Sequence, residues 1–138
     1  MADLFNFEVH TPYRLFYNGK AQAITLDLAD GEIGVYAKHS AFIAPVVTCI
    51  LRIKDEAGNW RAAFISDGIL EVKEFKNVLL VDSAEWPQEI DRERALAAKK
   101  KAEETILSTH LKFKEDKASA KLRRAEYRLK ALEYLDNN

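Results

Sequence analysis

The chain has 138 residues, a length that fits one compact domain with an appendage. Apolar residues make up 48% and charged residues 31%, with a net charge of −1, which excludes a chain that is disordered throughout. No apolar run is long enough to span a bilayer, and the first residues lack the basic and apolar regions of a secretion signal. The sequence therefore predicts a cytosolic protein, one that can still dock on something membrane-bound.

Charge is divided unevenly along the chain. Residues 1–90 hold 8 basic and 13 acidic side chains, whereas residues 91–138 hold 13 basic and 9 acidic side chains. A basic tail fits nucleic acid, an acidic protein surface or a phosphate-bearing ligand. Opposite charges interleave here, as in residues 99–104 (Lys-Lys-Lys-Ala-Glu-Glu), which is typical of a solvated helix face. Nucleic-acid binding is therefore the weaker alternative.

Residues 4–83 carry short apolar runs, each followed by a turn signal such as Thr11-Pro12, Asn18-Gly19 or Asp30-Gly31. This spacing, with Asn-Gly and Asp-Gly turns, is typical of an all-β sandwich or barrel. We therefore expect strands within seven runs: Leu4–Val9, Leu15–Tyr17, Ala21–Leu28, Ile50–Ile53, Trp60–Ile65, Ile69–Val72 and Val78–Val81.

The third of these runs alternates along its length. Strand periodicity places Ala21, Ala23, Thr25 and Asp27 on one face and the more apolar set of Gln22, Ile24, Leu26 and Leu28 on the other. The loop that follows, residues 30–35, lacks the third glycine and the helix of a dinucleotide-binding fingerprint. We interpret Gly31 and Gly34 as turn residues that need a positive φ.

The body offers no catalytic constellation. Cys49 cannot form an internal disulfide, nor can it supply a thiolate zinc site by itself, and its apolar neighbours predict a buried side chain. His39 and Ser40 are adjacent, so in an extended segment they point to opposite faces and do not form a proton-transfer pair. We expect His39 to order a loop through a hydrogen bond.

From Ile90 onward the sequence becomes helical. Asp91 is suited to be an N-cap, and a helix is expected to run to Ser108 or Thr109 with a stripe of small residues. A second helix is expected from Phe113 or Lys114 to Leu135, with apolar residues spaced four and three apart. The two stripes predict an antiparallel hairpin, and their narrow seam of small residues suits a part that detaches from the body. The stripes consist of Ala95, Ala98, Ala102 and Ile106 in the first helix, and of Ala118, Leu122, Ala125, Leu129 and Leu132 in the second.

Several motifs occur together in order. The body carries Thr11-Pro12, residues 30–35 (Asp-Gly-Glu-Ile-Gly-Val) followed by His39, and residues 67–72 (Asp-Gly-Ile-Leu-Glu-Val). The tail carries Ile-Asp-x-x-Arg-Ala over residues 90–95, an Ala-Lys-Lys-Lys-Ala-Glu-Glu run and a closing Arg-Arg-Ala-Glu-Tyr-Arg-Leu. These motifs are spread over nearly the whole chain, and through them the sequence resembles the epsilon subunit of bacterial F-type ATP synthase.

The resemblance implies a non-catalytic subunit with a mostly β N-terminal sandwich, residues 1–86, followed by an α-helical hairpin, residues 87–138. It implies a sandwich that clasps the gamma subunit and rests on the c-subunit ring, on the cytoplasmic side of the bacterial cell membrane. It also implies a hairpin that inhibits ATP hydrolysis when it opens toward the alpha and beta subunits. The basic residues implied in that contact are Lys121, Arg123, Arg124 and Arg128.

Some members of the family bind ATP at the folded hairpin without hydrolysing it. Carried over to this sequence, the implied site comprises Glu85, Ile90, Asp91, Arg94, Ala95, Arg124 and Arg128. Guanidinium groups suit phosphate oxygens, and a carboxylate can accept from the adenine amine. Asp91 as a simple cap and Arg94 as a partner of a body carboxylate remain the structural alternatives, and ATP is expected as a regulatory ligand rather than a required cofactor.

Two hypotheses that assign the chain to other classes of protein remain open. One is a stand-alone ATP-sensing module without a rotary partner, which has no need of a large apolar patch on its sandwich. The other is a small nucleic-acid-binding β-domain with a basic arm, which predicts strongly salt-dependent binding to any polyanion.

Overall fold

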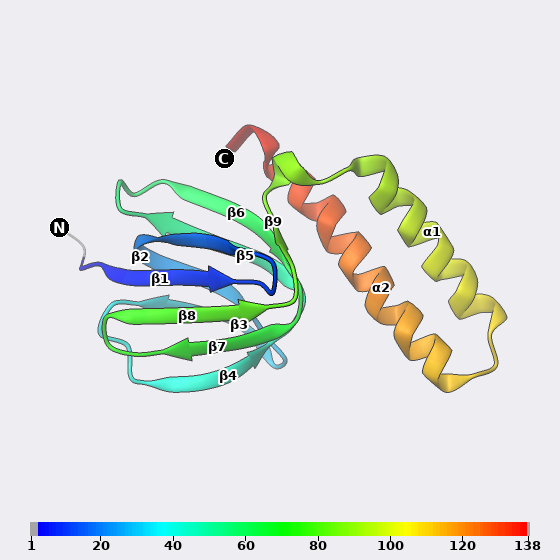
Figure 1. Ribbon diagram of the computed structural model, residues 1–138, viewed down its shortest axis with the longest axis horizontal. Coiled ribbons are helices and arrows are strands. Elements are labelled where there is room, and N and C mark those ends of the chain that lie inside the picture. The colour runs from blue at the N-terminus through cyan, green and yellow to red at the C-terminus, as the bar shows by residue number, and fades with distance from the viewer. Residues whose placement is uncertain (1–2, 138) are drawn as a thin grey trace.

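The computed structural model describes residues 3–137, so the outermost residues of the two predicted domains, 1–2 and 138, lie outside it. A β-sandwich is followed by a two-helix hairpin that projects from one end of it (Figure 1). Neither helix of the described chain has the length and apolarity that crossing a membrane requires. The strands are β1 (Phe5–His10), β2 (Leu15–Leu28), β3 (Gly31–Tyr36), β4 (Phe42–Val46), β5 (Cys49–Asp55), β6 (Trp60–Ile65), β7 (Gly68–Val72), β8 (Lys76–Val81) and β9 (Ala84–Glu85).

The strands form one continuous sheet that folds over on itself. Its order is β1-β8-β7-β4-β2-β5-β6-β9, with β3 on β2 and a further pairing of β1 with β2. The long β2 joins the two layers, because its first half pairs with β1 and its second half pairs with β3 and β5. All neighbours are antiparallel except β1 and β8. The predicted fold class, a sandwich followed by a helical hairpin, is confirmed.

The predicted turn at Asn18-Gly19 is wrong. Residues 15–28 form a single strand, in which Asn18 pairs with Glu8 and Gly19 pairs with Phe7 of β1. A local turn signal was overridden by pairing with a neighbouring strand. The sequence reading also missed β3, β4 and the short β9 as strands.

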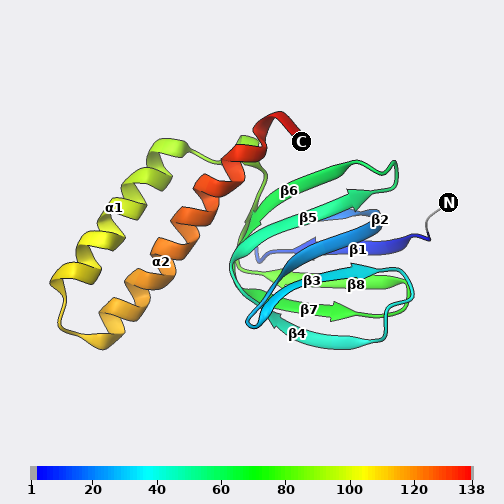
Figure 2. The same cartoon turned by 180° about the vertical axis from the view of Figure 1, so that it is seen from behind.

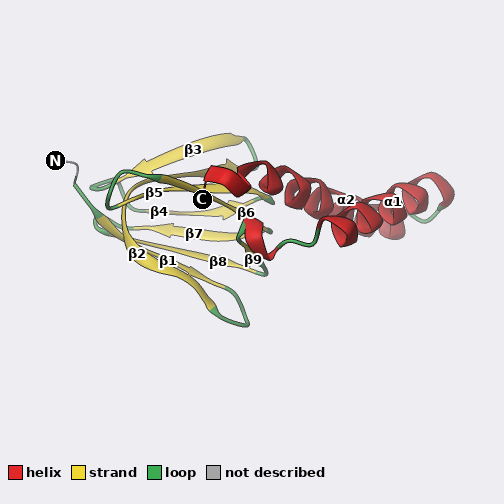
Figure 3. Ribbon diagram, turned by 90° about the horizontal axis from the view of Figure 1, so that it is seen from above, coloured by secondary structure: helices red, strands yellow, loops and turns green. Residues whose placement is uncertain are grey.

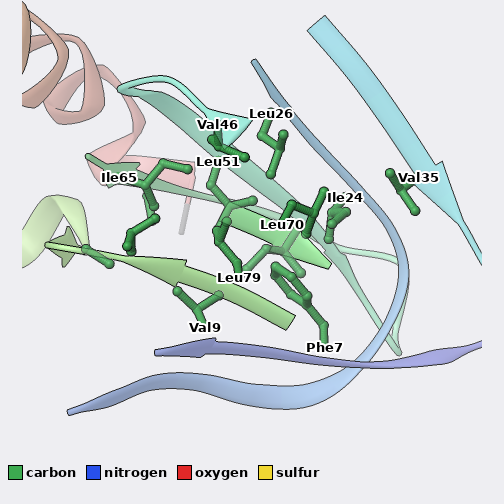
Figure 4. Close-up of a cluster of buried hydrophobic side chains, with 14 of the residues drawn as sticks. Phe7, Val9, Ile24, Leu26, Val35, Val46, Leu51, Ile65, Leu70 and Leu79 are labelled. Carbon is green, nitrogen blue, oxygen red and sulfur yellow. The ribbon is translucent and has the colours of Figure 1, made fainter. Parts of the chain in front are cut away.

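The predicted alternation in β2 breaks at a bulge. The pairing with β5 shifts register between Ala21 and Ala23, so Ala21 lies in the same core as Ile24 and Leu26 instead of on the opposite face. A bulge inserts one extra residue and reverses the side-chain parity beyond it. The core lies between the two layers and gathers side chains from both (Figure 4): Phe7, Val9, Ile24, Leu26, Val35, Val46, Leu51, Ile65, Leu70 and Leu79.

The single-residue predictions for the body have mixed outcomes. Gly31 has a positive φ of 137°, as expected, but Gly34 lies inside β3 opposite Thr25 without one. Cys49 is fully buried, and burial raises the pKa of its thiol to about 12. The ring of His39 donates from Nδ1 to the Ser40 carbonyl at 2.8 Å and packs edge-on to Phe42, so it orders its loop as predicted.

The tail begins with a 3-10 turn, η1 (Pro87–Glu89), followed by α1 (Arg92–Ser108), α2 (Lys112–Ala131) and a second 3-10 segment, η2 (Leu132–Asn137). Asp91 caps α1 by accepting from the Arg94 amide at 3.1 Å, as predicted. The seam buries alanines at 95, 102, 118 and 125, whereas Ala98 is exposed and was wrongly assigned to it. Of the two helices, α2 rests on β5 and β6 while α1 packs against α2 (Figures 2 and 3).

Candidate functional site

A pocket of about 200 Å³ lies where the hairpin meets the body. It gathers six of the seven residues predicted for ATP: Glu85, Ile90, Asp91, Arg94, Ala95 and Arg128. They come from β9, from the connection before α1, from the first turn of α1 and from the end of α2, so only the closed hairpin brings them together. Glu89 and Ala98 complete the lining, and Arg124 does not belong to it.

Arg128 and Glu85 form an ion pair across this pocket. The guanidinium donates from Nε to one carboxylate oxygen at 2.9 Å and from Nη2 to the other at 3.3 Å. Both side chains are about a quarter exposed, at 29% and 27%, and the guanidinium lies 4.6 Å from the ring centre of the buried Phe64. A forked, partly buried pair of this kind fixes geometry better than an exposed one. Arg128 therefore fastens the end of α2 to β9.

Arg94 lies in the same pocket but is held differently. Its backbone amide is used by the Asp91 cap, while among residues 3–137 its guanidinium has no ion pair or hydrogen bond that would occupy it. Of the two structural alternatives weighed for this motif, the cap role of Asp91 is present and a pairing of Arg94 with a body carboxylate is not seen in the described chain. The pocket thus presents one uncommitted guanidinium and one already paired with a carboxylate.

The other basic candidates lie along α2. Arg123 donates from Nε to the Thr48 carbonyl at 3.1 Å, and its guanidinium lies 4.9 Å from the Tyr127 ring centre. Thr48 is itself fixed by Asp67, whose carboxylate accepts from both the Thr48 amide and hydroxyl at 2.7 Å. Lys121 is exposed and Arg124 is half-buried. Two of the four predicted inhibitory residues, Arg123 and Arg128, are therefore hydrogen-bonded to the body while the hairpin is closed.

The sequence reading missed the residues that hold the connection before α1. The Glu89 carboxylate accepts from the Trp86 amide at 2.8 Å and pairs with Arg14 at 2.8 Å. Hydrogen bonding from Arg14 lowers the pKa of Glu89, and the same contact raises the pKa of Arg14. Pro87 followed by an acidic residue at the third position was a usable signal for a capped turn. The partner Arg14 lies 75 positions away and had no local signal.

The sandwich also exposes apolar side chains on three adjacent strands. Ile43 of β4 is 68% exposed, Ile69 of β7 is 50% exposed and Leu80 of β8 is 52% exposed, and Ile69 and Leu80 are register partners. We call these three residues the apolar strip. Ile69 and Leu80 also line a groove of about 590 Å³, together with Thr11 and Pro12. In the described part of the chain, the main contacts of α2 with the sandwich are with β5 and β6 and not with these three strands.

Comparison with known proteins identifies the two parts. The beta-sandwich domain of the ATP synthase delta/epsilon chain matches residues 4–87, and its long alpha-helix domain matches residues 88–133. The ATP synthase epsilon chain of Caldicellulosiruptor saccharolyticus is 43% identical over 129 residues, covering 94% of this chain and 93% of that one. The ATP synthase epsilon chain of Caldanaerobacter subterraneus subsp. tengcongensis is 41% identical over 131 residues, covering 94% of both.

Solved structures show the same fold at lower identity. A chain of the Euglena gracilis mitochondrial ATP synthase (OSCP/F1/c-ring) superposes with a TM-score of 0.82 at 21% identity, covering 94% of this chain and 81% of that one. A chain of the central stalk/c-ring of Tetrahymena thermophila mitochondrial ATP synthase gives 0.62 at 16% identity, covering 95% and 98%. The two matched domains and the bacterial relatives together show that this chain belongs to the epsilon-chain family of ATP synthase.

Proposed function

We propose that this chain is a non-catalytic central-stalk subunit that couples the rotor to the catalytic head and inhibits ATP hydrolysis through a mobile hairpin. Within the complex its partners are the gamma subunit, the c-subunit ring and the alpha and beta subunits. The complex holds it peripherally on the cytoplasmic side of a bacterial cell membrane. The support is family membership over nearly the whole chain together with the two-part architecture.

One observation carries the regulatory part: the hairpin is attached to the body by little apolar surface. Among residues 3–137, its polar attachments to the body are the ion pair of Arg128 with Glu85 and the hydrogen bond from Arg123 to Thr48, and its apolar contacts come from the partly buried Tyr127 and from η2. The closed hairpin is therefore suited to detach without unfolding the body, whose core contains no hairpin residue that is fully buried with it.

The apolar strip supports attachment to a protein partner. Exposed apolar side chains on neighbouring strands mark an interaction surface when the protein's own elements leave them uncovered. A stand-alone ATP sensor has no use for such a surface, so the strip favours the subunit over that alternative. We propose that the strip and its groove bind the gamma subunit, the partner that the family resemblance implies for the sandwich.

The attachment is tested by binding to a catalytic head that contains gamma but lacks this subunit. Replacing both Ile69→Asp and Leu80→Asp is expected to weaken binding at least a hundredfold, because two charges would be buried in the contact. The control is Leu107→Asp, which changes an 88% exposed leucine of the hairpin and should bind like the unaltered chain. Equal binding by the strip variant would remove the strip from the interface.

The inhibitory part follows from where the basic side chains lie. Opening the hairpin would free Arg123 and Arg128 from Thr48 and Glu85, and both would then be available to acidic residues of the beta subunit together with Lys121 and Arg124. The same two side chains would thus serve the body in the closed state and the catalytic head in the open state. The two uses exclude each other, as a switch requires.

ATP as a regulatory ligand is the finer part of the proposal. Arg94 and Arg128 suit phosphate oxygens, and Asp91 or Glu85 can accept from an adenine amine. The closed pocket, at about 200 Å³, is smaller than the 300–1,000 Å³ typical of small-molecule sites. Nucleotide binding would therefore need Glu85 to release Arg128. At one hundred times its dissociation constant, ATP would favour the closed state by about 2.7 kcal/mol, enough to bias a nearly balanced switch.

A further inference from the structure

Trp86, directly after the last strand, is clamped onto the body. Its ring stacks on Phe16 of β2 with centroids 4.5 Å apart and 25° between the planes. The guanidinium of Arg61 lies over the same ring at 3.9 Å from its centre, and Tyr17 meets it edge-on at 6.3 Å. Aromatic stacking and a cation over a ring both add stability beyond that of the area they bury. The connection to the hairpin therefore begins with a fixed residue.

The turn after Trp86 is held as well. Glu89 accepts from the Trp86 amide and pairs with Arg14, whose guanidinium also donates to the Ala84 carbonyl at 3.2 Å. Pro87 is buried, and the Ile90 amide closes η1 on the Pro87 carbonyl at 3.2 Å. Residues 86–89 are therefore held on the strands of the body, and η1 also contacts η2 at the end of the hairpin.

The hydrogen bonds of the connection change partner between Ile90 and Asp91. Ile90 donates back to η1, whereas the Asp91 carboxylate and carbonyl both accept from α1, from Arg94 and Ala95. Within residues 3–137, no backbone hydrogen bond between neighbouring turns crosses the peptide that joins Ile90 to Asp91. Both residues are extended, with φ of −88° and −87°, and α1 itself packs on α2 rather than on the strands.

We infer that the hairpin pivots at the Ile90–Asp91 connection and that residues 86–89 stay on the body as a fixed collar. This rests on the proposed mobility of the hairpin and deepens it. The pivot divides the pocket: Glu85 and Glu89 stay with the body, while Asp91, Arg94 and Arg128 leave with the hairpin. Any ligand that contacts both groups bridges the pivot and holds the hairpin closed.

The test uses distances between spin labels in the full chain. One label is placed at the exposed Glu56 of the body; the second is at Gln88 in the collar or at Glu104 on α1, both exposed. Cys49 is buried and its thiol stays protonated near neutral pH, so it is not labelled. The hairpin is released by Arg128→Ala, which removes its ion pair with Glu85.

In the Arg128→Ala chain we expect the 56–104 distances to gain a second, longer component while the 56–88 distances keep one narrow peak. If the 56–88 peak moves or broadens together with 56–104, the pivot lies closer to the body and the inference is overturned. If 56–104 keeps a single peak, the hairpin does not open: the inference and the proposed inhibitory mechanism both fail, while attachment to the head is still judged by its own binding test.

The clamp is tested separately by changing Trp86. Trp86→Ala, with the milder Arg61→Ala as a second variant, is expected to broaden the 56–88 distances in a chain that keeps Arg128. A narrow 56–88 peak in both variants would overturn the clamp as the cause of the fixed collar. The control is Trp60→Phe: the Trp60 ring lies under the Arg52 guanidinium at 4.8 Å instead of against Trp86, so this change should leave the 56–88 peak unchanged.

Discussion

Arg94 and Arg128 carry the same charge in one pocket but have different partners. Arg128 is bound to Glu85 and lies over Phe64, so its replacement disturbs the closed hairpin as well as any ligand contact. Arg94 has no such bond within the described chain, so its replacement reports on the ligand alone. Arg94 is therefore the better residue for testing the site.

We expect Arg94→Ala to weaken ATP binding at least tenfold, because a charged hydrogen bond is worth about 1.5–3 kcal/mol. Titration calorimetry measures the affinity, and a melting curve should show an unchanged fold. The control is Arg92→Ala, whose side chain lines a different groove between α1 and α2. Equal affinity in the Arg94 and Arg92 variants would remove the site.

Gly68 is required by close packing rather than by its backbone angle. A Cβ at this position would lie 2.0 Å from the Leu80 carbonyl oxygen of β8, where backbone cannot move aside. We expect Gly68→Ala to lower the free energy of unfolding in urea by about 2 kcal/mol or more. The control is Gly34→Ala, where the nearest atom is 3.7 Å away, and a change of about 0.5 kcal/mol or less is expected. Similar losses in both variants would contradict the packing argument.

At the scale of elements, α1 depends on its cap. Asp91 accepts from the Arg94 amide, and losing a cap of this kind costs about 1 kcal/mol. We expect Asp91→Ala to speed hydrogen exchange at the first turn of α1 about fivefold, measured by mass spectrometry or NMR. Asp91→Asn keeps the acceptor and should exchange as the unaltered chain does. Faster exchange in both variants would show that the charge, rather than the cap, stabilises the turn.

The elements that could be predicted are those with local signals. The cap at Asp91, the end of α1 at Ser108 and the turn at Asp30-Gly31 follow from residues within a few positions of each other. The continuous β2 and the strands β3 and β4 were missed, because they depend on pairing with distant strands. The bulge after Ala21 had no sequence signal, although it decides which face of β2 enters the core.

The residues of the candidate site divide in the same way, into those with a local sequence signal and those that depend on distant contacts. The Ile-Asp-x-x-Arg-Ala motif brought its four residues to one pocket because they lie close together in the sequence, between residues 90 and 95, and Glu85 and Arg128 were named through the family resemblance. The resemblance also named Arg124, which the closed hairpin leaves outside that pocket. The contacts of Arg14, Phe16 and Arg61 with the connection could not be read from the sequence, since each spans at least 25 positions.

At the scale of the whole molecule, a well-packed body carries a lightly attached hairpin. The body holds the extended core and the apolar strip, whereas the hairpin holds the basic side chains that fasten it to the body. This division lets one part stay bound to a partner while the other moves. The central claim is therefore that attachment belongs to the body and inhibition belongs to the hairpin.

The most direct test adds the whole chain, or a chain ending at Glu89, to a catalytic head with gamma that lacks this subunit, and follows ATP hydrolysis. Ending at Glu89 retains the Trp86 clamp and the whole apolar strip. We predict that both forms bind and that only the whole chain lowers the rate of hydrolysis. Equal inhibition by both forms would assign inhibition to the body and contradict the account.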